Sequence, residues 1–260
     1  MKVKIKGVSL FDDLGNTRIG TDKRIKPRLL YRSSHLAKIE KDQEEKLINK
    51  YNVRYVVDFR TDDEIASFPE LEDSEIKHYH FPALTNEQNT VITKKNRLRI
   101  LKKITASKGG AIAHMHTLYH NILTSAKAIE AFRNFFTVLL EAKENEAVVF
   151  HCTQGKDRTG MAMTLLLAAL GADNDLIIKK YMSYNALTRN FRFWVSVGMS
   201  LFKSPRLALS LDRMIGARKV YIRKVLETVE NVYGGFKNYL NNTIGLSDDE
   251  INQLRLKYLY

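Results

Sequence analysis

A cysteine and an arginine stand six positions apart in the segment His151-Cys152-Thr153-Gln154-Gly155-Lys156-Asp157-Arg158-Thr159-Gly160. An apolar run precedes this segment and a helix-forming apolar run follows it, so we expect a loop between a strand and a helix. Such a loop directs backbone N–H groups and the positive end of the helix at one point, which suits a phosphate-sized anion and favours a thiolate at Cys152. Arg158 adds a planar fork for two phosphate oxygens.

A nucleophile, an anion cradle and a clamp are the parts that phosphoryl transfer through a phosphocysteine needs, because the charge that spreads over the phosphoryl oxygens must meet donors already in place. This chemistry requires no metal and no cofactor. Cys152 is the only cysteine, which excludes an intramolecular disulfide and a cysteine-rich zinc site. We expect the rest of the loop to bind a phosphate group, through Thr153, Gln154, Gly155, Lys156 and Thr159.

The leaving group also needs a proton, and two aspartates are candidates for its donor. Asp157 lies inside the loop, and Asp58 ends another apolar run, at the edge where sites of α/β proteins gather. Residues 74–156 contain no aspartate. Asp157 serves either as the acid or as a structural carboxylate that holds Arg158 or a backbone N–H. Asp58 serves either to orient the loop or Arg60, or to transfer the proton. His151 either hydrogen-bonds within the loop or packs in its strand.

The elements that position these residues follow from short apolar runs that alternate with helical patterns. Thr61 and Glu64 have the spacing of a capping box, so a helix should begin directly after the strand that carries Asp58. We therefore expect an α/β fold, with a small, mostly parallel central sheet covered by helices and an antiparallel addition near the N-terminus. The strands are predicted at Arg28–Ser34, Arg54–Phe59, Ile76–Phe81 and Ala147–His151.

Helical patterns cover most of the remaining chain, and neither a repeat nor a linker interrupts residues 1–260, which predicts a single domain. Ser247 and Glu250 form a second capping box, and Pro205 and Gly216 should break a basic stretch into short helices. The helices are predicted at Lys41–Tyr51, Ala111–Leu140, Arg158–Leu170 and within Asp173–Tyr260. The basic, aromatic segment 184–217 has three interpretations: a lid over the loop, packing against the core, or contact with an anionic membrane surface.

The charge of the chain is strongly positive, with 42 Lys and Arg against 29 Asp and Glu, a net charge of +13. This charge attracts anionic partners such as phosphorylated substrates. It is concentrated in residues 88–129, which contain no acid, and in residues 189–224, whose only acid is Asp212. No apolar run is long enough for a membrane span, and no signal peptide is predicted at the N-terminus. The sequence is compatible with either a cytoplasmic or a secreted location.

The loop resembles the signature of cysteine-dependent protein tyrosine phosphatases. Its form HCxxGKDRTG is similar to that of the bacterial group that includes the secreted mycobacterial and listerial phosphatases with tyrosine and phosphoinositide activity. Further similarity lies in Leu30-Tyr31-Arg32-Ser33, in Val56-Val57-Asp58-Phe59-Arg60 with Glu64, and in YGGFKNYL with Ile244-Gly245-Leu246-Ser247. The resemblance covers nearly the whole chain. It implies a tyrosine-phosphatase-like fold with a helical lid segment, and Asp157 as the general acid.

The leading hypothesis is a phosphomonoesterase that acts on phosphotyrosine, and also on phosphoserine, phosphothreonine or phosphoinositides. A lysine at position 156 is similar to the loop of phosphoinositide phosphatases. The loop departs from the lipid-specific pattern at Thr153, where that pattern has a second lysine, and at Asp157, where it has a glycine. The alternatives are an enzyme primarily for phosphoinositides, a sulfurtransferase, and a phosphate-binding protein without activity. Arg158, followed by Thr159 and Gly160, argues against a sulfurtransferase. No nucleic-acid motif is evident, so we expect no nucleic-acid partner.

Overall fold

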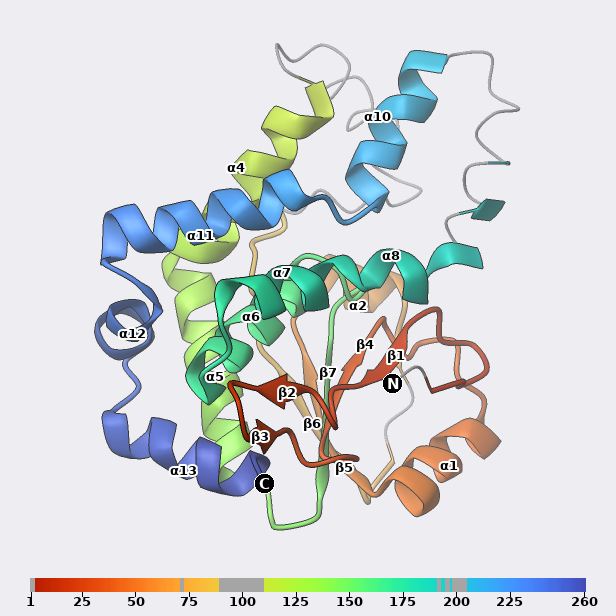
Figure 1. The fold of residues 1–260 in the computed structure, drawn as a ribbon. Helices are drawn as coiled ribbons and strands as arrows, with labels where there is room; N and C mark the ends of the chain where they lie inside the picture. Colours follow the sequence, from red (N-terminus) through yellow and green to blue (C-terminus); the bar gives the residue numbers. More distant parts are fainter. Residues whose placement is uncertain (1–2, 71–72, 89–109, 191–192, 195–196, 198–204) are drawn as a thin grey trace.

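A five-stranded sheet forms the centre of the computed structural model, which describes residues 3–70, 73–88, 110–190, 193–194, 197 and 205–260 (Figure 1). Its strands, in spatial order, are β1 (Phe11–Asp13), β4 (Leu30–Ser33), β7 (Ala147–His151), β5 (Val53–Asp58) and β6 (Lys77–His80). All neighbouring strands are parallel except β1, which is antiparallel to β4. The mostly parallel sheet with an antiparallel N-terminal addition is therefore confirmed.

Helices cover this sheet, and a two-stranded hairpin of β2 (Arg18–Ile19) and β3 (Lys23–Arg24) lies beside it (Figure 1). The helices before β7 are α1 (Lys41–Tyr51), α2 (Asp62–Ser67), α4 (Gly110–Thr124) and α5 (Ala126–Glu141). The helices after β7 are α6 (Arg158–Leu170), α7 (Asn174–Met182), α8 (Tyr184–Leu187), α10 (Pro205–Ile215), α11 (Lys219–Tyr233), α12 (Phe236–Asn238), the π-helix η1 (Tyr239–Ile244) and α13 (Asp248–Tyr258). Within the described parts of the chain, no helix is long and apolar enough to cross a membrane.

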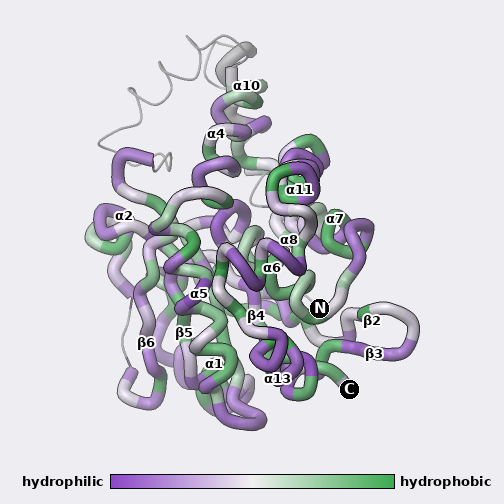
Figure 2. Tube along the Cα trace, turned by 90° about the vertical axis from the view of Figure 1, so that its left-hand side faces the viewer, coloured by the Kyte–Doolittle hydropathy of each residue, from purple (hydrophilic) through white to green (hydrophobic). Residues whose placement is uncertain are grey.

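Both faces of the sheet are buried, which explains the nearly continuous apolar runs of its central strands. Along β7, Val148 and Phe150 point into the larger core, which α4, α5, α6 and the C-terminal helices complete. Ala147 and Val149 point to the opposite face, into a smaller core that α1 covers. The edge strand β6 is polar and mostly exposed, and Figure 2 shows it in the hydrophilic colour.

The strand order brings three chain segments together at one edge of the sheet. Parallel strands end at the same edge, and the registers pair His151, the last residue of β7, with Ser33 of β4 and Asp58 of β5. The loop that follows β7 therefore lies between the segments that follow its two neighbouring strands. This arrangement places residues near 34, 60 and 153 side by side, although more than a hundred positions separate the first from the last.

The helix predicted at Ala111–Leu140 is in fact two helices, α4 and α5. Ser125 has an extended backbone, and its side-chain oxygen accepts a hydrogen bond from the N–H of Ala128 at 3.3 Å. It therefore ends one helix and caps the next. The sequence pattern missed this break because apolar residues continue on both sides of it.

Candidate active site

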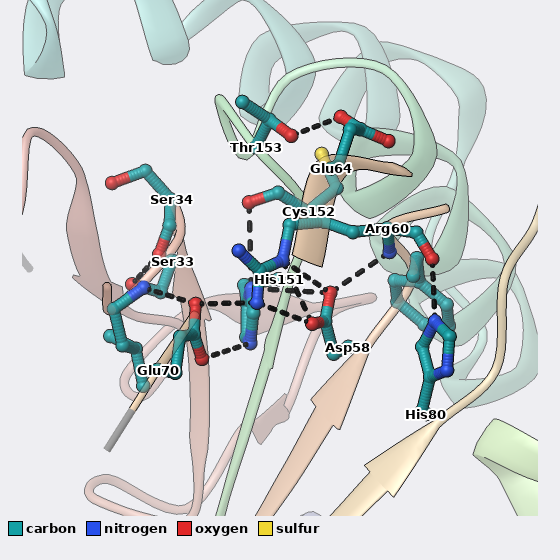
Figure 3. Close-up of polar contacts among 12 residues, drawn as sticks. Ser33, Ser34, Asp58, Arg60, Glu64, Glu70, His80, His151, Cys152 and Thr153 are labelled. Carbon is teal, nitrogen blue, oxygen red and sulfur yellow. Dashed lines mark hydrogen bonds and ion pairs between the residues drawn. The ribbon is translucent and has the colours of Figure 1, made fainter. Parts of the chain in front are cut away.

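The loop predicted to hold an anion connects β7 directly to α6. Cys152 follows the last residue of β7 and is only 2% exposed, while Asp157 occupies the N-cap position of α6 without a side-chain capping bond, and Arg158 is the first residue of that helix. In Figure 3 the sulfur of Cys152 lies on the side of Thr153 and Glu64, away from the ring of His151. The nucleophile candidate and the clamp candidate thus flank one turn at the N-terminus of a buried helix.

Gly155 allows this loop to lie close against β4. Its φ of +69° belongs to the left-handed region, and a Cβ atom there would lie 2.4 Å from the carbonyl oxygen of Ser33. Such a contact is far shorter than van der Waals distance, so any larger residue would push the loop away from the sheet.

Two carbonyl groups of the loop are tied to β4 and to the segment that follows it. Arg32 donates from Nε to the carbonyl of Gly155 at 2.8 Å, and the N–H of His35 donates to the carbonyl of Thr153 at 3.2 Å. The carbonyl and the N–H of a trans peptide unit point in opposite directions. The N–H groups of the next residues, Gln154 and Lys156, are therefore turned away from β4.

Arg158 is held in place by Glu64 of α2. Its Nη1 and Nη2 donate to the two carboxylate oxygens at 2.6 and 2.8 Å, and Nη1 also donates to the carbonyl of Phe59 at 3.1 Å. These contacts use the terminal edge of the guanidinium group. No hydrogen bond from a described residue occupies the side edge, formed by Nε and the second N–H of Nη2, which has the geometry to bind two oxygens of an anion.

Glu64 is itself fully buried and belongs to the predicted capping box. Its carboxylate accepts hydrogen bonds from the N–H of Thr61 at 3.0 Å and from the hydroxyl of Thr153. Burial favours the neutral acid, but the charge and the hydrogen bonds of Arg158 outweigh it and lower the pKa of Glu64 to about 2. Glu64 is therefore ionised at neutral pH, and the buried pair keeps Arg158 in one orientation.

A second charged cluster lies below Cys152 and contains Asp58, Arg60, Glu70 and His151 (Figure 3). Arg60 contacts Asp58 at 2.7 Å and Glu70 at 3.0 Å. The ring of His151 lies 3.7 Å from Asp58 and 3.3 Å from Glu70. Burial opposes the charged imidazole, but these carboxylates outweigh it and raise the pKa of His151 to about 9. Two carboxylates and a histidine would suit a metal ion, but the guanidinium of Arg60 already binds both carboxylates.

This cluster shows how Asp58 is used in the structure. Both carboxylate oxygens accept hydrogen bonds from Arg60 Nε, at 3.0 and 2.8 Å, and one also accepts from the backbone N–H of Arg60 at 2.9 Å. Asp58 thus makes the contact with Arg60 that its predicted orienting role requires, and the role itself stays a prediction. Proton transfer to a substrate would require it to give up these bonds.

Asp157, the other acid candidate, faces helices α4 and α7. The hydroxyl of Tyr119 donates to its Oδ1 at 2.6 Å, and Nζ of Lys156 lies 3.4 Å from the same oxygen. The side chain of Asp157 remains 20% exposed. It is thus fixed at one oxygen and accessible beside the loop.

Lys156 is completely buried and donates from Nζ to the carbonyl of Met214, near the C-terminal end of α10. Contact with a second substrate phosphate would require Met214 to move away, so that role stays a prediction.

The predicted lid segment 184–217 lies only partly within the described residues. Among these, α8 and α10 are present, and Phe193 and Trp194 are exposed. The basic residues between positions 94 and 108, which contribute to the positive charge of residues 88–129, lie outside the described residues.

The comparisons with known proteins agree with this geometry. Residues 3–260 match a family model described as the tyrosine phosphatase family. The chain belongs to this family. It is 24% identical to the triple specificity protein phosphatase PtpB of Mycobacterium tuberculosis, over 97% of each chain. It is 28% identical to a Cupriavidus necator protein whose name places it among tyrosine-protein phosphatases, over 95% of this chain and 84% of that protein. It is 31% identical to a tyrosine-protein phosphatase of Nostoc commune, over 45% of this chain.

Most of the predicted site residues of this phosphatase lie in the loop between β7 and α6 or in the first turn of α6. Gln154 is half-buried there. Thr159 is buried in the first turn of α6, and its hydroxyl has no hydrogen-bond partner among the described residues. Its predicted part in binding a phosphate group stays a prediction.

Sequence reasoning missed several residues around the phosphatase loop: Glu64 as the partner of Arg158, Arg32, Glu70, Tyr119, and Tyr181, whose hydroxyl lies 2.6 Å from that of Tyr119. Glu64 was visible as a helix-capping residue and as part of the family resemblance, but not as a partner of Arg158. Its position directly after a strand of the parallel sheet was the available signal, because that placement puts it at the edge where the loop lies. Glu70, Tyr119 and Tyr181 carry no such local pattern.

Proposed function

We propose that this phosphatase hydrolyses phosphomonoesters through a phosphocysteine on Cys152, with phosphotyrosine as a substrate and phosphoserine, phosphothreonine and phosphoinositides as further substrates. The observation that carries the proposal is the orientation of Arg158. Glu64 occupies the terminal edge of its guanidinium group, which leaves the side edge for two phosphoryl oxygens next to Cys152.

In the first step the thiolate of Cys152 attacks phosphorus, and the bond between phosphorus and the ester oxygen breaks. Arg158 and the N–H groups of the loop stabilise the charge on the three equatorial oxygens. Asp157 gives its proton to the leaving oxygen, which departs as an alcohol or a phenol.

In the second step a water molecule attacks the phosphocysteine. Asp157, now a carboxylate, accepts a proton from that water, while the bond between phosphorus and sulfur breaks. Inorganic phosphate leaves, and the thiolate is restored. Asp58 and His151 support the loop from below and take no proton from the substrate in this scheme.

The breadth of the proposed substrate range has two supports. The Mycobacterium tuberculosis relative carries triple specificity in its name. The net charge of +13 favours association with multiply charged anions. Both supports fit a substrate range that includes phosphorylated proteins and phosphorylated lipids. The segment 184–217 is proposed as a lid over the loop, because α10 reaches Lys156 through the carbonyl of Met214.

Phosphate release from p-nitrophenyl phosphate, measured with a chelator present, tests the mechanism. Cys152→Ser should abolish turnover while phosphate still binds, because the loop and Arg158 are unchanged. Arg158→Lys should also be severely impaired, since lysine keeps the charge but lacks the fork. Turnover at the wild-type rate by Cys152→Ser would contradict the mechanism. Sulfur transfer by the wild type without phosphate release would instead favour the sulfurtransferase alternative.

A second experiment decides between the two aspartates. Asp157→Asn should slow the hydrolysis of phenyl phosphate far more than that of an ester with a very good leaving group, because a good leaving group needs little protonation. Asp58→Asn should slow both substrates by a similar factor. If Asp58→Asn instead shows the dependence on the leaving group and Asp157→Asn does not, the assignment of the acid is reversed.

A further inference from the structure

A chain of two tyrosine hydroxyls ends on Asp157. Tyr119 of α4 donates to Oδ1 of Asp157 at 2.6 Å, and the hydroxyls of Tyr119 and Tyr181 also lie 2.6 Å apart. Tyr181 belongs to α7, so three segments that are distant in sequence meet at this carboxylate. Both rings are buried, and their centroids lie 6.2 Å apart.

The direction of these hydrogen bonds follows from protonation. Burial, followed by the charge of Asp157, raises the pKa of both tyrosines well above the usual value, so both phenols stay neutral. Tyr119 has one proton, which goes to the carboxylate. Tyr181 must therefore donate to Tyr119. A donor that itself accepts a hydrogen bond is a stronger donor, so Tyr181 strengthens the contact to Asp157.

The hydrogen bonds from Tyr181 to Tyr119 and from Tyr119 to Asp157 also make the two carboxylate oxygens of Asp157 different. Tyr119 donates to Oδ1, and Nζ of Lys156 lies 3.4 Å from the same oxygen, whereas no hydrogen bond from a described residue reaches Oδ2. Oδ2 is therefore the oxygen on which a transferable proton can reside. Because Tyr119 is held by its buried ring, its bond to Oδ1 fixes the rotation of the carboxyl group and hence the direction of Oδ2.

We propose that Tyr119 is a positioning residue for proton transfer by Asp157, with Tyr181 as its support. The inference rests on the proposed role of Asp157 as the general acid and deepens it. Tyr119 does not touch the substrate in this scheme. It acts by holding the carboxyl group so that Oδ2 faces the leaving oxygen.

The test is the hydrolysis of aryl phosphates with a series of leaving groups, measured as kcat/KM. Tyr119→Phe removes only the hydroxyl, and should slow phenyl phosphate by about tenfold while slowing esters with very good leaving groups much less. Tyr181→Phe should show the same trend with a smaller effect. Tyr221→Phe is the matched control, because its ring stacks on Tyr119 at 5.8 Å while its hydroxyl donates to the carbonyl of Arg213. That control should change all substrates by the same factor.

Thermal unfolding of each variant shows whether the tyrosine cluster is intact, and Tyr181→Phe carries the test if Tyr119→Phe does not fold. The proposal is wrong if Asp157→Asn depends on the leaving group but Tyr119→Phe and Tyr181→Phe behave like Tyr221→Phe. In that case the acid assignment stands. If Asp157→Asn shows no such dependence, Asp157 is not the acid, and both the assignment and this inference are overturned.

Discussion

Glu64 and Arg158 form a buried pair in which both carboxylate oxygens accept hydrogen bonds from the two terminal guanidinium nitrogens, at 2.6 and 2.8 Å. The two residues come from different elements, α2 and α6, that follow adjacent strands of the sheet. The pair therefore fixes the guanidinium group that we propose as the phosphate clamp relative to the central sheet. It also links the capping of one helix to the chemistry at the start of another.

Replacing Glu64 by Gln should lower kcat/KM on p-nitrophenyl phosphate by about 100-fold, because a clamp that is displaced by a fraction of an ångström loses the geometry of the transition state. It should also lower the free energy of unfolding by about 3 kcal/mol, since Arg158 is left as an uncompensated buried charge. The control is Glu75→Gln, whose exposed carboxylate lies 3.7 Å from Arg54. Equal activity of the two variants would contradict this role of Glu64.

Gly155→Ala should abolish phosphate binding, because its Cβ would lie 2.4 Å from the carbonyl oxygen of Ser33. Gly20→Ala is a matched control: the φ of Gly20 is +60°, but nothing lies within 4 Å of the added Cβ. Both variants share the backbone strain of about 1 kcal/mol that a left-handed alanine carries. Phosphate affinity, measured by calorimetry, should therefore fall only in Gly155→Ala. Normal affinity there would show that the loop does not need its close approach to β4.

His151 should make the stability of the protein depend on pH. Its pKa is raised from 6.5 to about 9 in the folded state, so its contribution is complete below pH 6.5 and is lost as the pH rises toward 9. The pKa of Glu70 is lowered from 4.5 to about 2, so its contribution is lost as the pH falls from 4.5 toward 2. Stability from this pair is therefore greatest between pH 4.5 and 6.5.

Urea unfolding at a series of pH values measures this dependence. The free energy of unfolding of the wild type should fall by about 2–3 kcal/mol between pH 6.5 and 9. His151→Asn should be less stable at pH 6 and should lose this slope. His120→Asn, at an exposed position of α4, should keep it. A slope that persists unchanged in His151→Asn would show that another group causes it.

Lys156→Met keeps the length of a buried side chain but removes the ammonium group. If lid opening frees Nζ from Met214 to meet a second phosphate, kcat/KM should fall more for a phosphoinositide than for a singly phosphorylated tyrosine peptide of low charge. Steady-state assays on the two substrates measure this ratio. An equal loss on both would mean that Lys156 only joins the loop to α10.

The sequence predicted the parts of the fold that local patterns control. The capping box at Thr61 and Glu64 and the apolar run at Ala147–His151 correspond to α2 and β7. The phosphatase family could be predicted because Cys152 and Arg158 lie in one short segment, and the chemistry proposed for that segment stays a prediction. Contacts between distant segments were not readable: Tyr119 reaches Asp157 from 38 positions away, and Glu64 reaches Arg158 from 94. Only the strand order brings such residues together.

The most direct measurement for the phosphatase mechanism is the capture of its covalent intermediate. The wild-type enzyme is mixed with p-nitrophenyl phosphate, quenched in acid within milliseconds, digested and analysed by mass spectrometry. The mechanism predicts one phosphoryl group on the peptide that contains Cys152, attached to sulfur, and its absence from Cys152→Ser. Because Asp157 also assists the second step, Asp157→Asn should accumulate more of this species with a good leaving group. Rapid turnover with an unmodified Cys152 and a phosphoryl group on another residue would contradict the account.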